Sequence, residues 1–368
     1  MVETLAYATL TLGGVYLMLL VAFLAGLCRL TPGDCTAQSS VTVVVAAHNE
    51  SEHIDACLSA LAAQRYPSNR TEIVVVDDRS TDDTASRAGQ WADRIPGLRV
   101  VRVADARYPC PKKNALDLGI RTSSGELILT TDADCRPPPS WIAATVRCFD
   151  AATGMVIGYA PLIPANSGWL QGMISLQGLV VAALAAGSTG IGFPVTCSGR
   201  NLAYRRSAFE AVGGFSAIGH ILGGDDVLLM RRISAQTEWN VRFNPDARSG
   251  VSSAPHDCGV LRRQVRYQSK AVHYGIPVLI LALPMYIFHS ILAAGPLLFY
   301  AYAELRWPLA GLLAGKTIAD AALLKTAAVR FGARLRPAWL IMLELISVPY
   351  VVLFCALGAL KPGRLRWK

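Results

Sequence analysis

Two acidic residues one position apart form the part of the chain best suited to chemistry. Asp132 and Asp134 directly follow the apolar run 126–130. A strand that ends in this way presents both carboxylates at the carboxyl edge of a sheet, where open α/β sheets bind ligands. Such closely spaced oxygen ligands suit Mg2+ or Mn2+, which in proteins link carboxylates to phosphate oxygens. The same spacing also occurs in ordinary solvated turns, so the prediction depends on the elements around it.

Those elements alternate between strand and helix. Short, β-branched, apolar runs predict buried strands at residues 41–47, 72–76, 98–103 and 126–130. Helical patterns follow at 54–61 and 112–120, and Ser80 or Thr81 could cap a further helix after the second strand. This alternation predicts an α/β fold, with a mostly parallel sheet and helices on both faces.

The motifs at the ends of these elements resemble those of the family-2 glycosyltransferases, which have the Rossmann-like GT-A fold. The first group comprises Ala-x-Asn-Glu at 47–50, Asp-Asp at 77–78, Lys-x-x-Ala-Leu at 112–116 and Asp-x-Asp at 132–134. The second group comprises Gly-x-Asn-x-x-x-Arg at 199–205, Gly-Gly-Phe at 213–215 and Asp-Asp at 225–226, where the family has Glu-Asp. The resemblance runs from about residue 41 to about residue 270 and implies a catalytic domain that binds a nucleotide sugar.

The resemblance also implies how the donor, a UDP- or GDP-sugar, would be held. Asp134 would bind the metal, and Asp132 would contact the ribose, the metal or a metal-bound water. The other donor contacts would come from Ala47, Glu50, Asp77, Asp78 and Lys112. Asp78 is expected near the nucleotide base, with Asp77 as the alternate, although Asp77 could instead hold the turn. Glu50 and Lys112 could instead be ordinary charges on helix surfaces.

The transfer also needs a base that takes the proton of the acceptor hydroxyl. By its position in the motif Asp226 is the predicted base, and Asp225 takes the supporting role of the family's Glu. Two adjacent acids raise one another's pKa if both point inward, which suits a base. The same pair could also favour the dipole of a helix over 227–233, which is compatible with catalysis. A single direct displacement predicts inversion at the sugar carbon.

Residues 263–267 resemble the Gln-x-x-Arg-Trp motif of membrane-bound family members, which lies on an interfacial helix lining the acceptor channel. Arg266 matches and could bind diphosphate, whereas Arg263 replaces the Gln and Tyr267 replaces the Trp. Tyr267 could still stack on a sugar ring. With Gln264 these residues form the predicted acceptor site. The alternative is a basic interfacial helix that meets lipid.

The composition predicts a membrane protein, because 52% of the residues are hydrophobic and only 17% are charged. Residues 5–27, 276–303 and 338–360 are each long enough to span a bilayer. Residues 307–324 contain Lys316 and Asp320, which could pair at i, i+4, so a span and an amphipathic surface helix are both open there. The apolar segment 168–192 is predicted to face the membrane without crossing it, because a crossing would separate the two halves of the site.

The predicted organisation has four parts: an anchor at 1–28, a catalytic domain at 40–255, an interfacial helix at 256–275 and a membrane region at 276–368. Glu3 precedes the anchor and Arg29 follows it, so the positive-inside rule places the catalytic domain in the cytoplasm, at the inner membrane. The basic residues at 325–336 and at 361–368 both look cytoplasmic as well. These two assignments conflict if residues 338–360 cross the membrane once.

The net charge of +9 is expected to attract lipid headgroups and phosphates rather than nucleic acid, because the basic residues flank apolar segments. The nine cysteines show no metal-binding spacing and are expected to be free thiols. The predicted activity is inverting, metal-dependent transfer of a hexose to a membrane-embedded lipid or lipid-linked acceptor. The alternatives are a chain-extending synthase of a surface polysaccharide, a nucleotidyltransferase, and a non-catalytic membrane scaffold. The chain has no Gly-rich phosphate loop near the first strand, and it keeps all the acids of the motifs, which argues against the last two.

Overall fold

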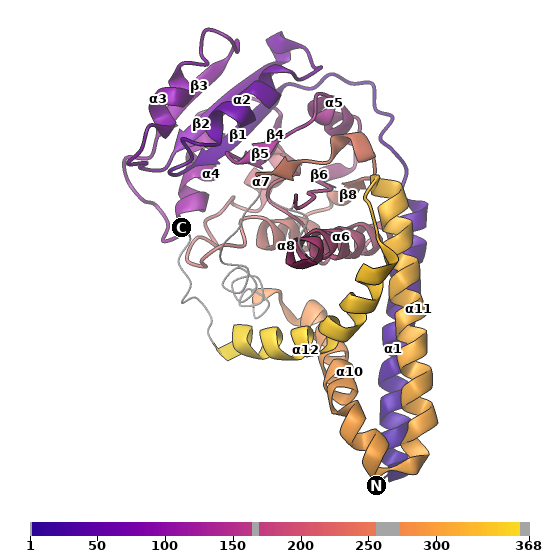
Figure 1. Ribbon diagram of the computed structural model, residues 1–368. Coiled ribbons are helices and arrows are strands. Elements are labelled where there is room, and N and C mark those ends of the chain that lie inside the picture. The colour runs from indigo at the N-terminus through magenta and orange to yellow at the C-terminus, as the bar shows by residue number, and fades with distance from the viewer. Residues whose placement is uncertain (1, 164–168, 255–272, 361–368) are drawn as a thin grey trace.

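The structure is a computed structural model that describes residues 2–163, 169–254 and 273–360 (Figure 1). Its centre is a seven-stranded sheet with the order β3-β2-β1-β4-β7-β6-β8. The strands are β1 (Val41–Ala47), β2 (Thr71–Asp77), β3 (Leu98–Arg102), β4 (Leu127–Asp132), β6 (Thr153–Gly158), β7 (Leu202–Arg205) and β8 (Asn240–Asn244). All neighbouring pairs are parallel except those that β7 forms with β4 and β6. The mostly parallel sheet was therefore predicted correctly.

Both faces of the sheet are buried, as the continuous apolar strands predict. The helices around the sheet are α2 (Ile54–Ala62), α3 (Thr84–Gly89), α4 (Pro111–Arg121), α5 (Trp141–Val146), α6 (Trp169–Gly190), α7 (Arg206–Ala211) and α8 (Val227–Gln236). Along β1, Val43 and Val45 pack into one core with α2 and α5. Val44 and Ala46 pack into the other core with α4, α6 and α8. Short elements complete the domain: η1 (Ser68–Arg70), η2 (Ala247–Ser249) and a ribbon of β5 (Cys135–Arg136) with β9 (Ser252–Ser253).

The cap predicted for the helix after β2 was wrong. α3 has Asp83 at its N-cap position, and the Asp82 carboxylate accepts the Thr84 N–H at 3.0 Å. Ser80 and Thr81 are occupied elsewhere, because both form hydrogen bonds with Asn49 in the loop after β1.

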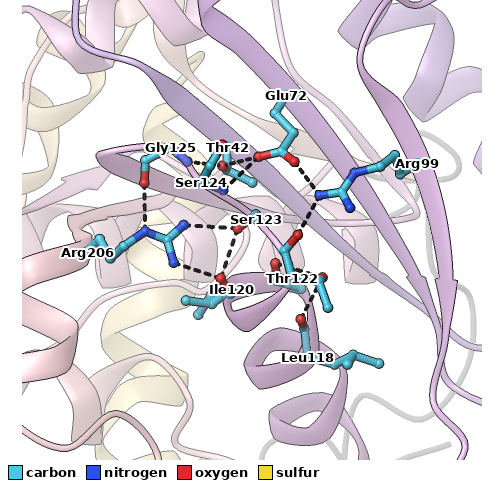
Figure 2. Close-up of polar contacts among 11 residues, drawn as sticks. Thr42, Glu72, Arg99, Leu118, Ile120, Thr122, Ser123, Ser124, Gly125 and Arg206 are labelled. Atoms are coloured by element: carbon cyan, nitrogen blue, oxygen red, sulfur yellow. Dashed lines mark hydrogen bonds and ion pairs between the residues drawn. The ribbon is translucent and has the colours of Figure 1, made fainter.

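A polar network fixes the sheet edge opposite the carboxyl ends of the strands (Figure 2). Glu72 of β2 accepts hydrogen bonds from Thr42 of β1 and from the Ser124 N–H, at 2.9 and 3.0 Å, and pairs with Arg99 of β3. Arg206 donates to the carbonyls of Gly125 and Ile120 and to the Ser123 hydroxyl, at 2.9, 2.7 and 3.0 Å. The network therefore holds the end of α4 and the start of β4 in one place.

Four further helices contain most of the remaining apolar sequence: α1 (Val2–Arg29), α10 (Ile276–Ala301), α11 (Arg306–Phe331) and α12 (Pro337–Leu360). A short turn, η4 (Ala303–Leu305), joins α10 to α11. In Figure 1, α1, α10 and α11 extend from the catalytic domain as a column. By length and composition the helices able to cross a membrane are α1, α6, α10 and α12, of which α6 qualifies over Gly172–Gly190 and α12 over Pro337–Leu357.

α6 belongs to the catalytic domain in spite of its apolar composition. The strands before and after it, β6 and β7, are antiparallel neighbours in the same sheet. The chain therefore leaves the sheet and returns to it, and α6 lies within this connection. α6 meets α1 where backbones touch: a Cβ on Gly26 would lie 2.1 Å from the carbonyl oxygen of Gly187.

Candidate active site

A cavity of about 220 Å3 lies beyond the carboxyl ends of β1 and β2 and is lined by His48, Asp78, Arg79 and Pro111. The Asp78 side chain is only 2% exposed. Its Oδ1 accepts a hydrogen bond from Arg79 Nε at 2.8 Å, whereas its Oδ2 is buried without a hydrogen-bond partner among the described residues. A buried polar atom left unpaired costs about 1–3 kcal/mol. The cavity therefore suits a ligand that offers an N–H group to Asp78.

The other residues expected at these strand ends lie close by but are more fully engaged. The Asp77 carboxylate accepts the Ser80 N–H at 3.3 Å and lies 3.4 Å from Arg102 Nε, so it holds the turn after β2. Ala47 is buried, and its carbonyl accepts the Asp78 N–H at 2.8 Å. Glu50 pairs with His53 at 3.0 Å.

The loops after β1 and β2 hold each other in an uncommon backbone conformation. Asn49 and Arg79 have φ values of 53° and 57°, in the left-handed region that few residues other than glycine adopt. Asn49 N–H donates to the Ser80 hydroxyl at 2.9 Å, and Asn49 Oδ1 accepts the Thr81 N–H at 2.8 Å. These cross-links offset the backbone cost and keep Arg79 beside Asp78.

Lys112 joins the two acidic motifs. It lies in the first turn of α4, and its Nζ is 2.6 Å from Asp132 and 3.4 Å from Asp225. Burial disfavours the charged form of Lys112, but the two carboxylates outweigh burial and hold its pKa well above the usual range. Lys112 is therefore a permanent positive charge between motifs that lie far apart in the sequence.

The Asp-x-Asp motif could hold a metal ion. One ligand atom each of Asp132, Asp134 and Cys135 lies within 4.8 Å of the others. Burial raises the pKa of the Cys135 thiol well above its usual range, and its Sγ donates to Asp134 Oδ1 at 3.4 Å. The thiol is therefore protonated, and the two carboxylates are the donors that fit Mg2+ or Mn2+. The loop is braced by the Ala254 N–H, which donates to the Asp134 carbonyl at 2.7 Å.

Asp226 lies at the N-terminus of α8, as predicted. Its Oδ1 accepts the Val227 N–H at 2.7 Å, and its Oδ2 accepts the Gly199 N–H at 3.3 Å. Gly199 lies close to this cluster, because a Cβ there would be 3.2 Å from Asp225 Oδ2 and 3.4 Å from Lys112 Nζ. The Gly-x-Asn segment and the Asp-Asp motif therefore meet at Lys112.

Tyr274 and Arg231 are site residues that the sequence analysis missed. Tyr274 lies two residues before α10 and is partly buried, and burial together with the charge of Asp226 raises the pKa of its hydroxyl. The hydroxyl is therefore protonated and interacts with the charge of Asp226. Arg231 lies on α8 near Tyr274 and makes no hydrogen bond or ion pair with any described residue. An aromatic residue at the end of an apolar segment is a common membrane-interface signal, which could have identified Tyr274.

The predicted acceptor residues Arg263, Gln264, Arg266 and Tyr267 lie outside the described residues. So does the predicted interfacial helix at 256–275, apart from its last three residues.

Comparison with known families supports the family resemblance. The family model described as "Glycosyl transferase family 2" matches residues 42–213. Among curated proteins, "Probable glycosyltransferase YdaM" of Bacillus subtilis is 30% identical over 210 residues, which are 56% of this chain and 49% of that protein. "Beta-monoglucosyldiacylglycerol synthase" of Synechocystis sp. is 33% identical over 113 residues, which are 31% of this chain and 23% of that protein. The matches thus span about half of these relatives or less.

Among solved structures, the mannosyltransferase PcManGT from Pyrobaculum calidifontis, in complex with GDP-Man and Mn2+, has the same fold. The TM-score is 0.64 at 23% sequence identity, and the match covers 97% of this chain and 99% of that chain.

Proposed function

Because this chain belongs to glycosyltransferase family 2, we propose that it transfers a hexose from a UDP- or GDP-sugar to a lipid or lipid-linked acceptor, with inversion. The reaction would take place at the cytoplasmic face of the inner membrane. The observation that carries this proposal is the position of Asp226, whose charge acts on Tyr274, two residues before the apolar helix α10. The base and the membrane helix thus meet at one place.

On the donor side, Asp78 Oδ2 would accept an N–H of the nucleotide base in the cavity beyond β1 and β2. Ala47 and Glu50 would line the same region. Asp134 and Asp132 would hold Mg2+ or Mn2+, which when bound absorbs the negative charge that develops on the leaving diphosphate. Lys112 adds a permanent positive charge next to Asp132. These residues would thus keep the diphosphate oriented while the bond to the sugar breaks.

On the acceptor side, Asp226 would take the proton of the attacking hydroxyl. The new carbon–oxygen bond would form on the face of the sugar opposite the breaking bond to diphosphate, which gives inversion. The backbone N–H groups of Gly199 and Val227 hold the carboxylate in place. Asp225 would act through Lys112 rather than on the substrate, which makes it a positioning residue.

The lipid character of the acceptor is supported by the apolar helices next to the site. It is also supported by relatives whose names state lipid acceptors: the beta-monoglucosyldiacylglycerol synthase, and the "Undecaprenyl-phosphate 4-deoxy-4-formamido-L-arabinose transferase" of Edwardsiella ictaluri. The half-buried Arg231 near Tyr274 offers a positive charge to an acceptor headgroup.

Membranes that contain the protein can be incubated with a panel of labelled nucleotide sugars, followed by lipid extraction. We expect one donor to label the lipid extract, and membranes with Asp226→Asn to show little label. Label that appears only in a water-soluble product would overturn the lipid acceptor, and label that appears only in a long polymer would favour a chain-extending synthase.

A further inference from the structure

Helix composition and helix packing identify different membrane-crossing helices in this chain. By composition, α12 qualifies as a span and α11 does not. The contacts of the two helices indicate the reverse.

α11 runs parallel to α1 along most of its length. A Cβ on Gly13 would lie 2.3 Å from Leu312 Cδ2, and the Tyr16 hydroxyl donates to Asp320 at 2.7 Å. At the other end, Arg330 donates to the carbonyls of Cys28 and Leu30, at 2.9 and 2.8 Å. From Gly13 to Cys28 the shared length is roughly 22 Å at 1.5 Å per residue. If α1 crosses the bilayer, α11 crosses with it.

The charges that lower the hydropathy of α11 are neutralised inside the bundle. Lys316 is 1% exposed, and its Nζ lies 2.7 Å from both Asp320 and Glu344. It also donates to the Ser347 hydroxyl at 3.2 Å. Intramembrane charges are tolerated when they face the interior and pair with one another. Composition alone counts these charges as unfavourable because it does not register their partners.

α12, in contrast, stays beside α6. A Cβ on Gly172 would lie 2.2 Å from the Trp339 ring, and Gln177 Nε2 is 3.5 Å from the Tyr350 hydroxyl. Because α6 connects two neighbouring strands of the sheet, these contacts hold α12 next to the sheet domain. Pro349 lies inside α12, where a proline removes a helix hydrogen bond and favours a bend. Figure 1 shows α12 leaving the line of α1 and α11 and running across beneath the catalytic domain.

We propose that α1, α10 and α11 cross the bilayer, and that α12 enters only the leaflet next to the catalytic domain. Both ends of α12 then lie on the catalytic side. The exposed apolar side chains of Ile341, Leu345 and Leu353 would contact the lipid of that leaflet. This arrangement removes the conflict in the charge pattern, because the basic residues at 325–336 and at 361–368 fall on the same side of the membrane.

Single-cysteine labelling tests this topology in the full-length protein. The variants Glu304→Cys, Arg334→Cys and Lys368→Cys are made in a background in which Cys28, Cys35, Cys258 and Cys355 are replaced by serine. Each variant is treated with a membrane-impermeant maleimide in right-side-out and in inverted vesicles. We expect Arg334→Cys and Lys368→Cys to react from one side and Glu304→Cys to react from the other.

Two results would overturn the proposal. If Lys368→Cys reacts from the same side as Glu304→Cys, α12 crosses the bilayer. If Glu304→Cys reacts from the same side as Arg334→Cys, α10 and α11 do not cross it. A fluorescent-protein fusion after Lys368 gives an independent measurement, because the fusion should fluoresce only if the C-terminus lies on the cytoplasmic side, and its side can be compared with that of a fusion after Arg334.

Discussion

At the scale of single residues, one lysine connects the two acidic motifs of the site. Lys112 lies within ion-pair distance of both Asp132 and Asp225, and Gly199 lies close to its Nζ. Four acids and one lysine gathered in one place leave an excess of negative charge, which a divalent cation would offset. The proposed donor and acceptor sites would therefore be coupled through charge as well as through the sheet.

Removal of the metal, or of its main ligand, should stop transfer. We expect a chelator to abolish activity, and Asp134→Ala to lower turnover by roughly 100-fold or more, since about 3 kcal/mol of lost transition-state stabilisation corresponds to that factor. Product formation from a labelled nucleotide sugar measures both effects. Asp150→Ala is the matched control, because Asp150 is an exposed acid remote from the Asp-x-Asp loop. Full activity in chelator would contradict a metal-dependent mechanism.

Replacement of the base should separate chemistry from donor binding. Asp226→Asn keeps the size and most hydrogen bonds of the side chain but cannot take the proton, so turnover should fall by roughly 100-fold or more. Nucleotide-sugar affinity, measured by calorimetry, should change little. Asp246→Asn is a matched control, because Asp246 is also an acid at a helix N-cap but belongs to η2. A variant that lost donor affinity and kept turnover would place Asp226 in the donor site instead.

At the scale of secondary-structure elements, the network at the far edge of the sheet keeps α4 in register with β4. The end of α4 is tied to Arg206 and the start of β4 to both Arg206 and Thr42, while the opposite ends carry Lys112 and Asp132. The contact at the active site therefore depends on hydrogen bonds at the other end of the same two elements.

Loss of Arg206 should destabilise the fold more than it affects donor binding. Arg206→Ala removes three hydrogen bonds from a charged group, so we expect the free energy of unfolding to fall by about 3 kcal/mol or more. Thermal unfolding in detergent measures the loss. Arg65→Ala, an exposed arginine on the same domain, should have little effect. Equal unfolding temperatures for the two variants would show that the network does not contribute to stability.

The charged cluster between α11 and α12 gives a second test at this scale. Lys316→Met leaves Asp320 and Glu344 buried without their partner, which should cost about 3–5 kcal/mol of stability. Replacing all three charged residues with apolar ones should recover much of that loss. Lys325→Met changes an exposed lysine on the same helix and serves as the control. If the triple variant were as unstable as Lys316→Met, the cluster would have a role beyond charge compensation.

The elements that local sequence determines were predicted well, and those that depend on distant partners were not. The strand over 41–47 was predicted to the residue. An apolar β-branched run forms a strand wherever both faces of the sheet are covered, so its own sequence is enough to identify it. The capping role of Ser80 and Thr81 failed because Asn49, in another loop, takes their hydrogen bonds. For residues 307–324 the sequence did not decide between a span and a surface helix, because a second partner of Lys316, Glu344, lies in another helix. The antiparallel orientation of β7 next to β4 depends on which strands become neighbours in the sheet. No local sequence pattern encodes that order.

At the scale of the whole molecule, the catalytic domain and the membrane helices are joined through backbone contact. α1 and α6 cross at Gly26, Gly187 and Gly190, where a Cβ on Gly190 would also lie 2.1 Å from the carbonyl oxygen of Gly26. α6 in turn packs beneath the sheet and against α11. The position of the domain over the membrane is therefore set by helix packing rather than by a linker.

Gly26→Ala should separate transfer to lipid from donor chemistry. The new methyl group would force α1 away from α6, so transfer to a membrane acceptor should fall several-fold while slow hydrolysis of the nucleotide sugar persists. Gly14→Ala is the matched control on the same helix, because a Cβ there meets nothing within 4 Å. Radiolabel in lipid and free sugar in the aqueous phase are measured in parallel. A parallel loss of both activities would show that the substitution only unfolds the domain.

The glycine crossing between α1 and α6 also bears on the distance between Asp226 and the bilayer. Because this crossing joins the sheet domain to α1 through backbone contact, Asp226 would stay at one distance from the bilayer plane. A lipid acceptor would then have to bring its hydroxyl to that distance by the length of its own headgroup. Lipids whose hydroxyl lies too deep, or extends too far into the water, would present it above or below the base. Acceptors of graded headgroup length should therefore show one optimum, and the enzyme would select its lipid by length as well as by chemistry.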